Sequence, residues 1–290
     1  MLKRINWKVI FYCFAWMICL GGVVVLMSFI SAKKETLKCK DVRVILPGNN
    51  NFIERDEVDR ILLESSGPLV GRNLNDINIH KLENVLKSNP FIEYAKVFAD
   101  MNGIVHVDIR QRKPVIRIIN MANVNFYIDE NGLKIPMSDN YTARVLVANG
   151  LIDEDFSGGV DTLSSQLARD LFRTAKFIQA DTLWNDQIEQ LFVDLKGDIE
   201  IVPRVGDHKI ILGSADSLEV KFRNLLVFYK KAMPKVGWDT YKSINLKYAN
   251  QIICEKNITD STALKNAPVI KPGADSIIVT SQDSIINQRI

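Results

Sequence analysis

The feature that most constrains this chain is an uncharged apolar run near its N-terminus. Residues 9–30 read VIFYCFAWMICLGGVVVLMSFI and contain no Asp, Glu, Lys or Arg. A helix of this length rises about 33 Å, which is enough to cross the hydrocarbon core of a bilayer. Trp7 and Trp16 lie near one end of the run, and Lys33 and Lys34 follow the other. The pattern predicts a single membrane-spanning helix, because the run is too long for the apolar region of a cleaved signal peptide.

The charges on the two sides of this run do not choose its orientation. Lys3, Arg4 and Lys8 precede it, and five basic residues follow it before residue 44. The positive-inside rule therefore gives no preference. A short N-terminal tail is easily retained in the cytoplasm, so we expect residues 1–8 to be cytoplasmic and the rest of the chain to lie outside.

Composition excludes several classes of protein. The 290 residues carry 37 Lys and Arg against 34 Asp and Glu, and this net charge of +3 argues against a broadly basic nucleic-acid binder. The apolar content of 47% is enough to bury a core. Four cysteines are too few for a disulfide scaffold. Cys13 and Cys19 lie in the apolar run, which leaves Cys39 and Cys254 either to form one disulfide or to remain two free thiols.

After a polar linker at residues 31–41, the patterns predict an α+β unit over residues 42–112. β-branched runs with an Asn-Gly turn at 102–103 indicate strands, and apolar residues spaced three and four apart indicate helices. The predicted order is β-α-α-β-β, with two helices packed on one side of three strands. The expected elements are a strand at 42–46, helices at 54–65 and 76–88, and strands at 92–98 and 104–109.

Residues 113–256 predict a second, mostly β domain with two helices. A long apolar stripe from Val160 to Ile178 indicates one helix, with Asp161 as its N-cap, and residues 218–229 indicate the other. We expect strands at 115–119, 125–128, 133–135, 144–148, 188–195, 199–202, 209–212, 243–246 and 251–254. Residues 257–290 lack aromatic residues and are rich in polar ones, which predicts a disordered tail.

No pattern in the sequence points to catalysis. Motifs for a nucleophile elbow, a phosphate-binding loop or a zinc protease are missing. His80, His106 and His208 do not have the spacing of metal ligands, so each is interpreted as an ordinary structural residue. We therefore expect no enzyme activity, no metal, no cofactor and no small-molecule substrate. What remains is protein binding, for which the final strand of the domain, residues 248–254, is a natural exposed sheet edge.

Several motifs, taken in order, resemble the FtsQ/DivIB family of cell-division proteins. No single motif is specific to this family, but the order and spacing of the motifs along residues 8–256 are specific to it. They are Gly71-x-Asn73-Leu74, Asn89-Pro90-Phe91-Ile92, Gln111-Arg112-Lys113-Pro114-Val115, Phe126-Tyr127-Ile128-Asp129-x-x-Gly132 and Ile244-Asn245-Leu246-Lys247-Tyr248. The chain departs from the family at Phe91, where the family has tryptophan, and at residues 147–150, which lack the family's proline.

The resemblance implies a membrane-anchored scaffold of the bacterial division machinery that links early and late division proteins. Residues 42–112 would be a POTRA domain, a module that docks other proteins, and residues 113–256 the family's β domain. The expected partners are the small coiled-coil proteins FtsB and FtsL, together with the septal peptidoglycan synthesis proteins FtsW and FtsI. By position, Tyr248, Asn250 and Ile252 would contact the partner.

The resemblance also implies a location at the division septum, in the inner membrane, with a cytoplasmic N-terminus and periplasmic domains. Two other readings remain open. One is a different POTRA-bearing adaptor in envelope assembly or secretion, although such proteins usually carry several POTRA repeats or a β-barrel. The other is a membrane-anchored hydrolase, which would need a polar catalytic cluster that the sequence does not reveal.

Overall fold

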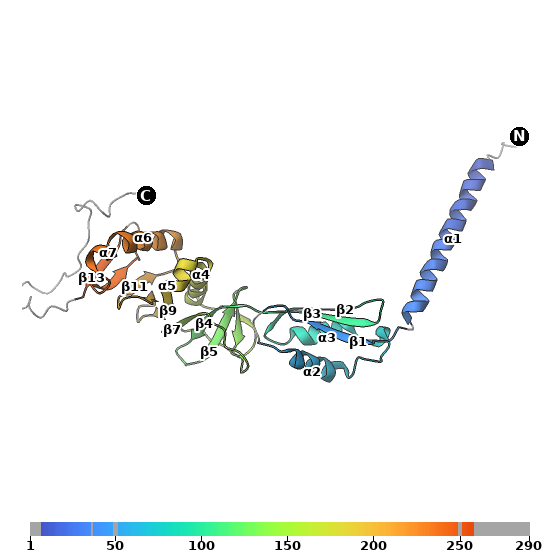
Figure 1. Cartoon of the computed structure of the whole chain (residues 1–290), viewed down its shortest axis with the longest axis horizontal. Coiled ribbons are helices and arrows are strands. Elements are labelled where there is room, and N and C mark those ends of the chain that lie inside the picture. The colour runs from blue at the N-terminus through green and yellow to red at the C-terminus, as the bar shows by residue number, and fades with distance from the viewer. Residues whose placement is uncertain (1–6, 36, 49–51, 249–250, 258–290) are drawn as a thin grey trace, which may run out of the picture. The chain divides into compact units, whose positions relative to one another are not determined.

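The computed structural model describes residues 7–35, 37–48, 52–248 and 251–257, and all statements below concern these residues. The chain divides into two compact units, an N-terminal unit of residues 1–111 and a C-terminal unit of residues 112–290 (Figure 1). Each unit is built around its own cluster of buried apolar side chains.

The first element is a helix, α1, which runs from Trp7 to Glu35. Its side chains are described over residues 11–27, where they are exposed. No helix in the described ranges is both long enough and apolar enough to cross a membrane. The membrane span predicted over residues 9–30 is therefore not confirmed.

The N-terminal unit has the predicted order β-α-α-β-β. In its three-stranded sheet the central strand is β3, which pairs in parallel with β1 and antiparallel with β2. One short 3-10 helix, η1, was not predicted. The elements are β1 (Asp41–Ile45), α2 (Arg55–Ser66), η1 (Leu74–Asp76), α3 (Ile79–Lys87), β2 (Ile92–Ala99) and β3 (Ile104–Gln111).

Helices α2 and α3 supply the core of this unit from their predicted apolar stripes. Val58 and Leu62 of α2 and Leu82 and Leu86 of α3 are buried in one cluster with alternate residues of β2 and β3. The turn between β2 and β3 requires glycine at position 103. Its φ is +88°, and a Cβ atom there would lie 2.6 Å from the carbonyl oxygen of Lys38.

The C-terminal unit is built on one sheet of ten strands in the order β13-β12-β11-β10-β9-β7-β4-β5-β6-β8. Most neighbours are antiparallel, but β4 with β7, β7 with β9, and β11 with β12 are parallel. The strands are β4 (Pro114–Ile119), β5 (Asn125–Asp129), β6 (Leu133–Pro136), β7 (Leu146–Gly150), β8 (Asp161–Thr162), β9 (Ile188–Val193), β10 (Ile199–Pro203), β11 (Lys209–Gly213), β12 (Tyr241–Asn245) and β13 (Ile253–Lys256).

Four helices accompany this sheet in the described ranges, rather than the two predicted. They are α4 (Gln166–Ala180), α5 (Thr182–Gln187), α6 (Leu218–Lys231) and α7 (Met233–Val236). The prediction missed α5 and α7 because helices of six and four residues are too short to show a helical period. It also placed the start of α4 too early. The N-cap is Ser165, whose side chain accepts a hydrogen bond from the Ala168 amide, and Asp161 belongs to β8.

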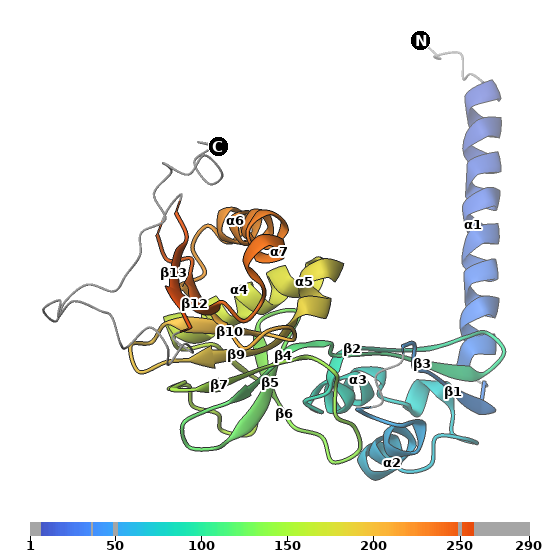
Figure 2. The ribbon, with the colours of Figure 1, turned by 60° about the vertical axis from the view of Figure 1, so that its left-hand side comes forward.

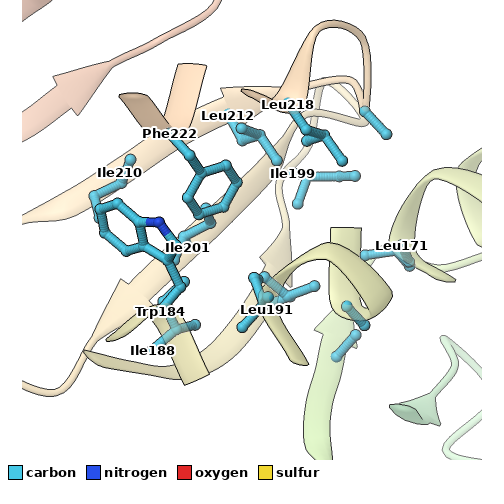
Figure 3. Packing of buried hydrophobic residues seen from close by; sticks show 14 of the residues in the cluster. Leu171, Trp184, Ile188, Leu191, Ile199, Ile201, Ile210, Leu212, Leu218 and Phe222 are labelled. Atoms are coloured by element: carbon cyan, nitrogen blue, oxygen red, sulfur yellow. The ribbon is translucent and has the colours of Figure 1, made fainter. Parts of the chain in front are cut away.

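The helices group along one side of the sheet (Figure 2). Alternate strand residues such as Leu191, Ile201 and Leu212 meet Leu171 of α4 and Phe222 of α6 in a single core. Figure 3 shows this packing, in which Trp184 of α5 lies edge-on to Phe222 with ring centres 5.0 Å apart. The predicted mixed α+β class is therefore confirmed. The C-terminal unit is built on one large β sheet, whose strand order the sequence patterns did not predict.

A buried ion pair links β6, near the β8 end of this sheet, to the residues that begin α4. Lys134 of β6 and Glu154 have side chains that are 2% and 0% exposed, and the ammonium nitrogen lies 3.0 Å from Glu154 Oε1. Glu154 also accepts hydrogen bonds from the Ser164 amide, the Ser164 hydroxyl and the Ser165 amide, each at 2.8 Å. Burial raises the pKa of Glu154, but the hydrogen bonds from Ser164 and Ser165 and the Lys134 ammonium outweigh it and lower that pKa to about 2.

We predict that Glu154→Gln destabilises the C-terminal unit by about 3 kcal/mol, because it leaves the Lys134 ammonium buried without its main counter-charge. Urea denaturation at neutral pH measures the effect. The matched control is Glu130→Gln, which removes a pair with Lys113 at 3.9 Å between largely exposed side chains and should cost less than about 1 kcal/mol. Equal losses in the two variants would contradict this account.

The contribution of Glu154 to stability also depends on pH. Because the pKa of Glu154 in the folded protein is below its unfolded value of 4.5, the stabilisation is full above pH 4.5 and fades as the pH falls toward 2.

Candidate partner-binding edge

The ten-stranded sheet ends at β13. This strand pairs with β12 on one side, in an antiparallel register that sets Ile244 against Cys254 and Asn245 against Ile253. Within the described residues no strand covers its other side. The backbone groups along such an edge can accept a further strand from another chain, so β13 is a geometrically suitable docking position.

The structure places the three predicted contact residues differently from one another. Tyr248 is 51% exposed, whereas Ile252 is 8% exposed and belongs to the core of the unit. Asn250 lies outside the described residues. The sequence patterns began the last strand at Gln251, but β13 begins at Ile253. Tyr248 and Ile252 therefore belong to the connection between β12 and β13, one facing solvent and one facing the core.

The connection before Tyr248 is held in place by its neighbour Lys247. The Lys247 ammonium lies 2.6 Å from Oδ2 of Asp198, a residue of the turn between β9 and β10. The Lys247 amide donates to the Asn245 side chain. The Asp198 carboxylate raises the pKa of Lys247, so this contact remains ionic at neutral pH. In addition, the Leu246 amide donates to the Ile211 carbonyl oxygen at 2.8 Å. These contacts fix the backbone from which the exposed Tyr248 ring projects.

The surface of the edge is polar, while the side chain beneath it is a buried thiol. Glu255 of β13 accepts from the Ser243 hydroxyl at 3.3 Å and lies 3.4 Å from the Lys242 ammonium. Burial raises the pKa of the Cys254 thiol to about 12, so the sulfur behaves as an apolar core atom. Cys39 is likewise buried, and both thiols are free. Of the two alternatives left open by the sequence, the structure has free thiols and no disulfide.

Next to this part of the sheet, the structure forms an aromatic cluster that the sequence did not indicate. His208 precedes β11 and is 1% exposed, with Nε2 2.9 Å from the Tyr229 hydroxyl of α6. Its ring stacks with Trp238, and Trp238 meets Tyr229 edge-on at 5.1 Å. Burial lowers the pKa of His208, while the charges of Asp207 and Asp239 act in the opposite direction. No sequence spacing could have found this cluster, because its members come from three separate segments.

In the part of the chain that the structure describes, no group of three or more His, Cys, Asp or Glu side chains is placed to hold a metal ion. The other two histidines lie in the N-terminal unit. His106 pairs with Asp100 at 3.2 Å, and His80 is exposed on α3 beside Glu83.

This arrangement defines a class: a POTRA-like domain followed by a domain built on a large open sheet. Residues 37–110 match the family model of the POTRA-like domain. Residues 113–255 match the model described as FtsQ/DivIB, C-terminal related. A comparison with curated proteins finds no match. The two family matches confirm the resemblance to the FtsQ/DivIB family that the sequence motifs carry.

We predict stability effects of very different size for Tyr248 and Ile252, the two predicted contact residues that the structure describes. Ile252→Ala should destabilise the C-terminal unit by about 2–4 kcal/mol, because it leaves a cavity in the core. Tyr248→Ala should change the free energy of unfolding by less than about 1 kcal/mol, because Tyr248 is 51% exposed and is not part of the core. Chemical denaturation of both variants measures the difference. A large loss with Tyr248→Ala would show that its role is packing rather than contact.

We also predict that His208 makes the stability of the C-terminal unit fall in mild acid. Its folded pKa is below the unfolded value of 6.5, so its neutral form stabilises the fold above pH 6.5 and the contribution is lost as pH falls through that value toward the folded pKa. Thermal denaturation at pH 7.5 and pH 5.5 should show a larger loss for the wild type than for His208→Gln. The control His80→Gln removes an exposed histidine and should follow the wild type. Identical pH dependence in all three proteins would contradict the assignment.

Proposed function

We propose that this protein is a non-enzymatic scaffold of the bacterial division machinery that binds small coiled-coil partners of the FtsB and FtsL type. The observation that carries the proposal is the outer side of β13, which no described strand covers, at the end of a domain related to the FtsQ/DivIB C-terminal domain. Through this contact the protein links early and late division proteins and regulates septal peptidoglycan synthesis by FtsW and FtsI.

The chemistry of the edge supports binding by strand addition. A partner strand laid beside β13 gains backbone hydrogen bonds, and its alternate side chains meet the exposed surface next to it. Tyr248, in the connection between β12 and β13, has a large amphipathic ring that is partly exposed. Tyrosine is enriched among the residues that contribute most to the affinity of protein interfaces. We propose that Tyr248 and Asn250 contact the partner directly and that Ile252 anchors the connecting segment to the core.

We propose the location that the family resemblance implies. The protein acts at the inner membrane of the division septum, with a cytoplasmic N-terminus and both units in the periplasm. The described face of α1 supports attachment to an apolar phase, since Phe11, Trp16 and Leu26 are between 65% and 74% exposed. Carbonate extraction of membranes and protease accessibility in spheroplasts test the attachment and the side, and a freely soluble protein would contradict both.

In-cell crosslinking tests the proposed partner. A photo-reactive amino acid at Tyr248 should capture a small single-span coiled-coil protein, whereas the same probe at Val160, beside the strand at the opposite end of the sheet, should not. Depletion of the protein should block septation and produce filaments. Capture of an outer-membrane protein at Tyr248, with normal septation after depletion, would instead favour the runner-up function, an adaptor in envelope assembly or secretion.

A further inference from the structure

The exposed face of α4 carries basic and neutral side chains but no exposed acidic one. Arg169, Arg173 and Lys176 follow one another at about one helical turn, so they form a basic row roughly 10 Å long. The acidic residue of this helix, Asp170, is only 8% exposed. We call the row of Arg169, Arg173 and Lys176 the α4 basic face. The other exposed residues of the helix are Gln166, Gln179 and Ala180.

The charges of this face are only partly neutralised within the protein. Arg173 pairs with Asp170. In contrast, the Arg169 guanidinium donates to the carbonyl oxygens of Leu163 and Ser164, both at 3.1 Å. The Lys176 ammonium lies 3.4 Å from the Glu130 carbonyl oxygen. Among the ion pairs of the described residues, neither Arg169 nor Lys176 has a carboxylate partner, so two positive charges remain available to a ligand.

A shallow apolar groove lies beside these charges. It has a volume of about 380 Å³ and is lined by Gly132, Leu163, Gln166, Arg169, Phe172 and Arg173. Phe172 contributes the apolar surface, with the Lys176 ammonium 5.5 Å from the centre of its ring. The lack of a side chain at Gly132 keeps the groove open, since a Cβ atom there would lie 3.5 Å from the Phe172 ring. The site therefore combines cationic groups with room for one apolar side chain.

We propose that the α4 basic face and its groove bind an acidic segment of a protein partner, with carboxylates on Arg169 and Lys176 and one apolar side chain beside Phe172. The pattern fits a protein better than a single phosphate group, because the cations are spread along roughly 10 Å instead of converging on one point. Carboxylates two helical turns apart on a partner helix have the same spacing as Arg169 and Lys176. This surface is separate from the β13 edge, so the inference does not depend on the proposed edge contact.

Fluorescence anisotropy with the full-length protein in detergent tests the proposal. The probe is a labelled twelve-residue peptide of glutamates with one central phenylalanine. Arg169→Gln/Lys176→Gln should weaken binding of this peptide by about tenfold at low salt, as expected from the loss of two exposed charge contacts. Replacing the phenylalanine of the peptide with alanine should also weaken binding to the wild type. Both effects should shrink as the salt concentration rises.

Matched controls separate a specific surface from general attraction. Lys230→Gln/Lys231→Gln removes the same charge from exposed positions on α6 and should leave binding of the peptide unchanged. Tyr248→Ala should also leave it unchanged, so a failure here and a failure of the edge contact are distinguishable. Equal weakening by both double variants would overturn the proposal. So would binding of anionic lipid vesicles through Arg169 and Lys176 without any binding of the peptide.

Discussion

An open sheet must end somewhere, and the organisation of the C-terminal unit depends on that constraint. Ten strands lie in one sheet, the helices cover one of its faces, and the order begins at β13 and finishes at β8. At the β8 end, the buried Lys134 and Glu154 pair fastens the short final strand to the start of α4. At the β13 end, no strand among the described residues pairs with the outer side of β13.

The two ends of the sheet are stabilised in different ways. The interior is held by a continuous apolar core in which Leu191, Ile201 and Phe222 meet. Beside the edge, Lys247 fixes the connection through Asp198 rather than through strand pairing. A partner strand would therefore meet a preformed surface and would lose little free energy in ordering it. The proposed scaffold role requires a stable core together with an ordered binding edge, because a scaffold acts by binding its partners.

The elements of the N-terminal unit were predictable from local sequence patterns. For the β13 edge, the sequence predicted a final strand but not where that strand begins or which of its neighbouring side chains are exposed. The stripes that contain Leu82 and Leu86 and the turn at Gly103 each carry a signal within a few residues, and the fold follows them. The start of α4 was misplaced because Asp161 is as good an N-cap as Ser165 in sequence, and only the long-range contact with Lys134 assigns it to a strand. The opposite exposures of Tyr248 and Ile252 were equally hidden, because they depend on where β13 begins. His208 and Tyr229 come together only through the tertiary fold.

Hydrogen exchange of the β13 amides tests the central claim most directly. The full-length protein is compared with and without the purified coiled-coil partner captured at Tyr248. The account predicts slower exchange on binding within Ile253–Lys256, since added strand pairing protects those amides of β13 that are not paired with β12 in the free protein. Unchanged exchange along β13, together with new protection elsewhere in the chain, would contradict the claim that this edge is where the partner binds.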